Sequence, residues 1–171
     1  ETEYVLVRDG RFQFADRPGK PVRFLGVNST HTSPLLDKQV AERYADQLAR
    51  MGYNAVRFHH FDWTLVDSSG KRNEEALERM EYFFHCLKRR GIYLTLDLYT
   101  GFFVTNGRIR EWPKELQREI KALVPVSDDA MRIMKDFASW LLLHRNPHTG
   151  LAWKDDPALF AVSLINENYL F

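Results

Sequence analysis

Residues 160–168 have the sequence Phe160-Ala161-Val162-Ser163-Leu164-Ile165-Asn166-Glu167-Asn168, an apolar run that ends in three polar residues. The apolar part has the length and composition of a strand buried on both faces, as parallel strands in α/β proteins are. Because side chains alternate along a strand, one face would carry Ala161, Ser163, Ile165 and Glu167, and the other Val162, Leu164 and Asn166. Glu167 would then stand at the carboxyl end of a buried strand, where α/β enzymes place catalytic groups.

Upstream of this stretch the same helix–glycine–strand joint occurs twice. Arg50-Met51-Gly52-Tyr53 leads into a predicted strand over 53–60, and Arg90-Gly91-Ile92-Tyr93 leads into another over 92–99. Glycine is typical of the position just after a helix. Repeated βα units imply a parallel sheet with right-handed crossovers. Together with a first strand predicted over 22–28 and the closing stretch, they predict an α/β fold with four parallel strands. Helix N-caps are expected at Asp37, Asn73 and Ser127.

The amino-terminal segment has the pattern of a β-hairpin. Asp9-Gly10 lies between two short segments of strand character, 4–8 and 11–14, and this dipeptide is a strong hairpin signal. We expect residues 1–21 to form a hairpin and a lead-in that closes one end of the domain. Residues 22–171 would form three βα units and a fourth strand, so that 1–171 is a single domain or part of one.

Length, charge and cysteine content restrict the possible functions. The 171 residues suffice for one domain but are few for a complete eight-stranded α/β barrel. Lys and Arg number 24 against 23 for Asp and Glu, so no basic surface indicates a nucleic-acid or membrane partner, and a neutral ligand is expected. No apolar run reaches the roughly 18 residues of a membrane helix. The single Cys86 lies in an apolar helical pattern and is interpreted as a core residue.

Polar residues recur on one face of the predicted strands. Thr95 and Asp97 share a side of the third strand with two tyrosines, and the opposite side is wholly aliphatic. By the same alternation the inward-facing strand ends collect Asn28, Arg57, His59, Asp97, Tyr99 and Glu167. Buried charges without partners are costly, so a purely apolar core would not contain this set. The alternative is a structural ion pair between Arg57 and Asp97.

Glu167 is the strongest catalytic candidate in this set. A partly buried carboxyl at that place can act as a general acid or base, whereas the alternative is an ordinary surface carboxylate. Asn166 beside it could bind a substrate hydroxyl. His59 and His60 are adjacent on a strand and point apart, so no metal site is predicted. No glycine-rich phosphate loop and no strand lysine occur, so no cofactor and no Schiff-base chemistry are expected.

Four aromatic residues lie in or beside the loops that follow the second and third strands: Trp63, Phe102, Phe103 and Trp112. Stacking against a sugar ring is one interpretation, and packing over the loop is the other. The sequence favours neither.

Three motifs in order resemble the cellulase-like glycoside hydrolases, within the clan of retaining (β/α)8-barrel glycosidases that includes family 5. Phe24-Leu25-Gly26-Val27-Asn28, Gly52-Tyr53-Asn54-Ala55-Val56-Arg57 and Ile165-Asn166-Glu167 resemble the first, second and fourth strands of this family. Residues 146–151 and 155–159 are similar to its cellulase-like branch. The resemblance implies a TIM (β/α)8 barrel, of which this chain would form the first four strands, a half-barrel preceded by the hairpin.

The resemblance also implies roles for individual residues. Glu167 would be the acid/base, Asn166 would bind the sugar 2-hydroxyl and Arg57 would support the site electrostatically. The family often has Asp-x-His on the third strand, where this chain has Tyr99 in place of the histidine. The predicted substrate-binding residues are Asn166, Arg57, His59, His60, Tyr99, Asn28, Trp63 and Trp112. The implied substrate is an oligosaccharide or polysaccharide, a β-linked glucan, mannan or related glycoside, and a secreted or periplasmic location is favoured.

The nucleophile of such an enzyme would be a glutamate on the seventh strand, about 5–5.5 Å from the acid/base in a retaining mechanism. We therefore expect it outside this chain, in a natural protein that is longer. A half-barrel would expose two strand edges and an apolar interior, which favours self-association or pairing with a C-terminal half-barrel. The rival hypothesis is a fragment or module that binds carbohydrate without catalysis.

Overall fold

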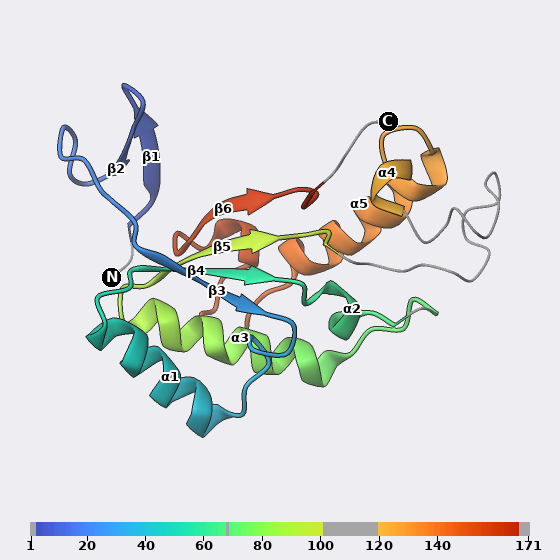
Figure 1. The fold of residues 1–171 in the computed structure, drawn as a ribbon, viewed down its shortest axis with the longest axis horizontal. Helices are drawn as coiled ribbons and strands as arrows, with labels where there is room; N and C mark the ends of the chain where they lie inside the picture. Colours follow the sequence, from blue (N-terminus) through green and yellow to red (C-terminus); the bar gives the residue numbers. More distant parts are fainter. Residues whose placement is uncertain (1–2, 68, 101–119, 168–171) are drawn as a thin grey trace.

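The computed structural model describes residues 3–67, 69–100 and 120–167. Its centre is one parallel sheet whose spatial order follows the chain order (Figure 1): β3 (Gly26–Thr30), β4 (Ala55–His59), β5 (Tyr93–Asp97) and β6 (Leu159–Ser163). Each strand is thus added beside the one before it, as consecutive right-handed βα units require. The prediction of four parallel strands is confirmed.

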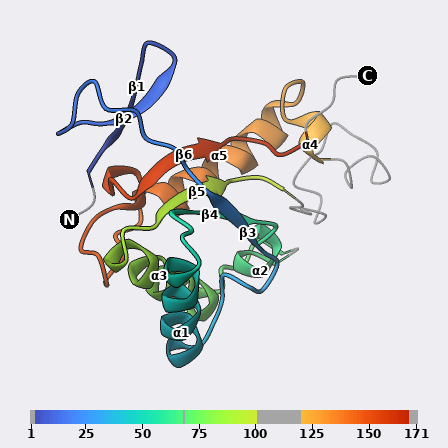
Figure 2. The same ribbon diagram turned by 60° about the vertical axis from the view of Figure 1, so that its left-hand side comes forward.

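Three long helices connect the strands: α1 (Lys38–Arg50), α3 (Glu74–Arg89) and α5 (Asp128–Leu143). The side chains of the three predicted N-cap residues, Asp37, Asn73 and Ser127, each accept a hydrogen bond from the third backbone N–H that follows. Figures 1 and 2 place α1 and α3 side by side along one side of the sheet, with α5 behind β6. The described residues also form three short helices: α2 (Asp62–Leu65), α4 (Ile120–Leu123) and η2 (Trp153–Asp155).

The two helix–glycine–strand joints have the conformation that the sequence predicts. Gly52 and Gly91 have φ of +84° and +68°, in the left-handed region that favours glycine. Tyr53 N–H and Ile92 N–H then donate to carbonyl groups of the last helical turn, at Leu48 and Leu87. Each helix is thereby closed before its strand begins.

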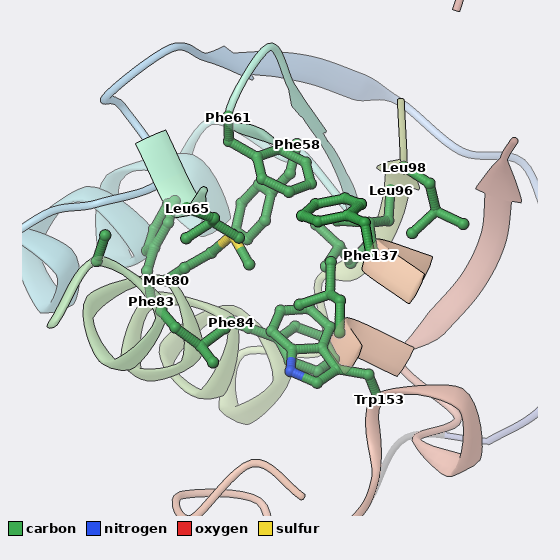
Figure 3. Packing of buried hydrophobic residues seen from close by; sticks show 14 of the residues in the cluster. Phe58, Phe61, Leu65, Met80, Phe83, Phe84, Leu96, Leu98, Phe137 and Trp153 are labelled. Atoms are coloured by element: carbon green, nitrogen blue, oxygen red, sulfur yellow. The ribbon is translucent and has the colours of Figure 1, made fainter. Parts of the chain in front are cut away.

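The hydrophobic core lies between the helices and the face of the sheet that carries Phe58 and Leu96, here called the outer face. Figure 3 shows its aromatic side chains gathered between the strands and the helices. The ring of Phe58 stacks on Phe83 of α3 with centroids 5.5 Å apart. Cys86 is fully buried in the same core, as predicted, and burial raises the pKa of its thiol to about 11.

The hairpin of β1 (Val5–Arg8) and β2 (Arg11–Phe14) forms around the predicted turn. Asp9 and Gly10 have φ of 51° and 70°, the two positive values that a type I′ turn requires.

An aromatic cluster joins this hairpin to the amino-terminal ends of the strands. Phe14 stacks on Tyr93 at 5.5 Å between centroids, and Phe12 meets Phe24 edge-on at 5.6 Å. Phe24 in turn stacks on Phe160 at 4.3 Å. The hairpin therefore covers the end of the sheet opposite to the polar strand ends (Figure 1).

Two strand predictions differ from the structure. The first strand begins at Gly26 rather than residue 22, because Val22 N–H donates to Phe12 of the hairpin at 2.8 Å. The prediction that residues 160–165 form a strand buried on both faces is wrong. Val162 is 38% exposed and Ala161 is also exposed, since β6 stands at the edge of the described sheet and pairs only with β5 there.

Within the described part of the chain, no helix is long and apolar enough to cross a membrane.

Candidate active site

Polar side chains meet at the carboxyl ends of the central strands, on the face opposite to the hydrophobic core, here called the inner face. Asp97 is the last residue of β5 and is 2% exposed. Its Oδ2 accepts a hydrogen bond from Arg57 Nη2 at 2.5 Å and also contacts His59 Nδ1. The ion pair considered from the sequence is therefore present, and His59 is a third member of it.

Asn166, three residues after the end of β6, also contacts Arg57. Arg57 Nη2 donates to Asn166 Oδ1 at 2.9 Å, and Asn166 N–H donates to the carbonyl of Tyr99 at 2.9 Å. Lys121 Nζ donates to the Asn166 carbonyl at 3.1 Å. Asn166 is 8% exposed, and its Nδ2 is buried without a hydrogen-bond partner among the described residues.

The predicted alternation of side chains fails after Ser163, where β6 ends. Residues 164–167 bend and turn instead of continuing the strand, so Asn166, rather than Glu167, reaches Arg57. Glu167 has φ +52° and is exposed. The expectation that its carboxyl is partly buried is therefore wrong for the described residues.

His60, the residue after β4, is close enough to Glu167 for their charges to interact. Burial lowers the pKa of His60, the charge of His59 lowers it further, and the charge of Glu167 acts in the opposite direction. Like Glu167, His60 has a left-handed backbone, with φ +53°. Non-glycine residues in this conformation are often found at functional sites, where the surrounding structure holds them.

A ring cluster extends from His60 toward solvent. The His31 ring stacks on His60 with centroids 5.3 Å apart, and Trp63 Nε1 donates to the His60 carbonyl at 2.6 Å. Trp63 is 46% exposed, so it offers a flat apolar surface beside the polar group. His31 belongs to no motif in the sequence. Its φ of +58°, one residue after β3, is a structural signal with no counterpart in the sequence pattern.

The remaining predicted residues are placed differently. Asn28 is the register partner of Arg57 on β3 and is exposed. Tyr99 is fully buried in the hydrophobic core, and burial raises the pKa of its hydroxyl well above the ordinary value. Its ring has no exposed surface, so its contact with a substrate stays a prediction that this burial does not support. Trp112, Phe102 and Phe103 lie outside the described residues.

The arrangement combines an exposed carboxyl, a fixed amide, a guanidinium and an exposed indole on one edge of the sheet. No group of three His, Cys, Asp or Glu side chains in the described part could hold a metal ion. The chemistry available from the residues present is proton transfer at Glu167 and hydrogen bonding at Asn166 and Arg57.

Comparison with curated proteins gives relatives of one kind, although no family model matches the chain. Mannan endo-1,4-beta-mannosidase 4 of Oryza sativa subsp. japonica is 28% identical over 173 residues, which cover 91% of this chain and 36% of the relative. Putative mannan endo-1,4-beta-mannosidase 9 of the same organism is 31% identical over 109 residues, 60% of this chain and 26% of the relative. The chain thus spans about a third of the length of the curated relatives it matches.

Solved structures give the same picture of the fold. The endo-1,4-beta-mannanase from Rhizomucor miehei superposes with a TM-score of 0.73 at 19% identity, covering 96% of this chain and 48% of that chain. A glycoside hydrolase family 5 mannosidase from the same organism gives a TM-score of 0.75 at 18% identity, with coverage of 98% and 49%. The chain is thus similar in sequence to mannan endo-1,4-beta-mannosidases, and its fold is that of about half of a family 5 glycoside hydrolase chain.

Proposed function

We propose that this chain supplies the acid/base half of a retaining glycoside hydrolase that cleaves β-glycosidic bonds of a glucan, a mannan or a related glycoside. Glu167 is the general acid/base, Asn166 donates a hydrogen bond to a sugar hydroxyl, and Arg57 provides positive charge beside them. The relatives named mannan endo-1,4-beta-mannosidases support mannan within this class.

The observation that carries the proposal is the orientation of the Asn166 amide. Arginine has only donors, so the atom that meets Arg57 Nη2 at 2.9 Å must be the amide oxygen. The amide nitrogen is consequently the free end, and it has no partner among the described residues. A buried donor without a partner is unusual in a folded protein. A sugar hydroxyl oxygen beside Glu167 would satisfy it.

The role of Glu167 follows from its place next to this donor. A glycosidic oxygen must be protonated as the bond breaks, and the same group must later take a proton from water in a retaining mechanism. An exposed carboxyl in the turn after Asn166 is accessible to a bound sugar. The left-handed backbone of Glu167 and its charge interaction with His60 support a defined placement for it.

The nucleophile belongs to a segment outside these 171 residues in this proposal. A retaining site needs a second carboxyl about 5–5.5 Å from the first. Asp97, the carboxylate of the adjoining strand end, is 2% exposed, and one oxygen is shared by two donors. It is therefore poorly placed to attack a sugar carbon. Pairing with a C-terminal half-barrel, or self-association, stays a prediction.

The test is Glu167→Gln in the complete protein, assayed on two kinds of substrate. Loss of a general acid typically lowers the rate by about 10²–10⁴-fold, and we expect a decrease of this size in kcat on β-mannan. The decrease should be far smaller on an aryl β-mannoside with a 2,4-dinitrophenyl leaving group, because that group departs without protonation.

Glu75→Gln is the matched control, since Glu75 is an exposed glutamate on α3 whose carboxyl pairs with Arg79 of the same helix, and its change should leave both rates unaltered. Equal loss on both substrates in Glu167→Gln would remove Glu167 from the acid role. Binding of mannohexaose without hydrolysis of any substrate by the unaltered protein would favour the rival hypothesis of a non-catalytic carbohydrate-binding module.

A further inference from the structure

One nitrogen of Arg57 makes two contacts that use both of its hydrogens. Nη2 donates to Asp97 Oδ2 at 2.5 Å and to Asn166 Oδ1 at 2.9 Å. The Arg57 side chain is 36% exposed, so the surrounding protein does not confine it by burial alone. Its direction depends on the acceptor on its buried side, and that acceptor is Asp97.

Asp97 is held more firmly than the arginine it binds. Its side chain is 2% exposed, it ends a strand of the sheet, and its Oδ2 is also in contact with His59 Nδ1. The His59 side chain is 11% exposed, and His59 is the last residue of β4, next to Phe58, which is the register partner of Leu96. Two buried side chains, Asp97 and His59, thus hold the half-exposed guanidinium of Arg57, and Arg57 in turn holds the Asn166 amide.

We propose that Asp97 is a positioning residue that acts through Arg57 to fix which end of the Asn166 amide faces the ligand. With Arg57 held in place, the amide oxygen is occupied, and the buried amide nitrogen is left as a donor without a partner among the described residues. The inference rests on the proposed function, in which that donor meets a sugar hydroxyl. It makes the site selective for a group with a free lone pair at that place, such as the 2-hydroxyl of a mannoside or glucoside.

A purely structural ion pair between Arg57 and Asp97 is the competing explanation. Both explanations predict some loss of stability when Asp97 is changed, because removal of one partner leaves a poorly solvated charge. Only the positioning role predicts that the loss of activity depends on what the substrate offers to Asn166. The experiment therefore compares substrates rather than stability.

Asp97→Asn would be assayed in the complete protein on an aryl β-mannoside and on its 2-deoxy analogue. A displacement of about 1 Å in a positioning group can cost about 10²-fold, and we expect a decrease of this order in kcat/KM on the 2-hydroxy substrate. The 2-deoxy substrate, which makes no such contact, should lose little. In an Asn166→Ala background, Asp97→Asn should add almost nothing on either substrate, because the two changes remove one connection.

His59→Gln provides a second variant in case Asp97→Asn does not fold. This variant keeps the Asp97 carboxylate and removes only its contact with His59. We therefore expect the same dependence on the substrate, with a smaller decrease in kcat/KM. Asp46→Asn is the matched control, since Asp46 binds Arg90 at 2.6 Å on the helical side of the protein. This change should alter the rates on the two substrates equally, if at all.

A spectroscopic measurement separates this inference from the proposed function. The side-chain amide resonances of Asn166 should shift in Asp97→Asn and stay unchanged in Asp46→Asn, whether or not the protein hydrolyses any glycoside. Unchanged resonances, or equal losses on the 2-hydroxy and 2-deoxy substrates, would overturn the positioning role. If the resonances shift but Glu167→Gln loses nothing on mannan, the connection stands and the proposed function fails.

Discussion

The two faces of the β4–β5 strand pair have opposite chemistry at adjacent residues. On the outer face Phe58 is fully buried against Phe83 and the other rings of the core. One residue earlier, on the inner face, the half-exposed Arg57 is bound to Asp97 and Asn166. Because alternate residues of a strand point to opposite faces, two adjacent residues of β4 contribute one to the core and one to the polar group.

This difference separates stability from recognition. Burial of large rings away from water is the main favourable contribution to folding, so the outer face should account for most of the stability. The inner face contains charges whose desolvation offsets much of their attraction, and such groups are weak evidence for stability. Changes on the outer face should therefore alter unfolding, and changes at the inner strand ends should alter ligand binding.

The largest effect is expected for Phe58→Ala on the outer face. Replacing a buried phenylalanine by alanine typically costs about 3–5 kcal/mol, because transfer energy is lost and a cavity remains. Urea unfolding followed by circular dichroism measures this loss. Phe58→Leu retains most of the side-chain volume and should lose much less, and a loss below about 1 kcal/mol for Phe58→Ala would contradict the assignment of Phe58 to the core.

A smaller effect, which depends on pH, is expected for Glu81→Gln within the helical side of the core. Glu81 is 2% exposed, Trp153 Nε1 donates to its carboxyl at 3.2 Å, and His144 Nε2 lies 3.0 Å away. Burial raises its pKa to about 7 from an ordinary value of 4.5, and the charges of Glu78 and Glu74 also raise it. The folded protein therefore holds this proton more tightly than the unfolded chain does.

The sign of the pH effect follows from that difference. The stabilisation from protonated Glu81 is complete below pH 4.5 and is lost as the pH rises to about 7. The stability of the unaltered protein relative to Glu81→Gln should thus fall by about 2–3 kcal/mol between pH 4 and pH 8. Urea unfolding at a series of pH values measures it.

Glu78→Gln on the same helix is the control with the opposite sign. The hydrogen bond from Lys38 lowers the pKa of Glu78, so its contribution is present above the ordinary value and is lost as the pH falls. Its carboxyl is 40% exposed, and the effect should be small. A flat pH difference for Glu81→Gln would show that the carboxyl is hydrated in solution.

The smallest effect on stability is expected for Trp63→Ala at the inner strand ends. The side chain is 46% exposed and makes one backbone hydrogen bond, so the loss should be about 1 kcal/mol or less. If the indole stacks on a sugar, the Kd for mannohexaose should rise about tenfold, as measured by calorimetry. Unchanged affinity together with a large loss of stability would show that Trp63 at the inner strand ends contributes to folding rather than to ligand binding.

Features that depend on local chemistry could be predicted from the sequence. Asp37, Asn73 and Ser127 cap helices because a short polar side chain can accept from the first free N–H groups, whatever the rest of the fold. The Asp9-Gly10 turn is similarly local, since both residues tolerate positive φ. The alternation on β4 and β5 also correctly grouped Arg57, His59 and Asp97, because these strands are regular.

Features that depend on where a strand stops could not be predicted in this way. The apolar residues Leu164 and Ile165 look like a continuing strand, yet the backbone bends there, which exchanges the directions of Asn166 and Glu167. Tyr99 follows β5 after its regular part has ended, so strand alternation does not apply to it. His31 could not be predicted because its contact is with His60, 29 positions away along the chain.

The rate at which the buried thiol of Cys86 reacts with an added reagent can report how often the core around α3 opens. Thiolate is the form that reacts with disulfide reagents, and a pKa of about 11 keeps nearly all of the thiol protonated at neutral pH. The side chain is also fully enclosed by the core. Modification of Cys86 can therefore proceed only when the packing around α3 loosens, and the rate of labelling reports how often that helix separates from the sheet.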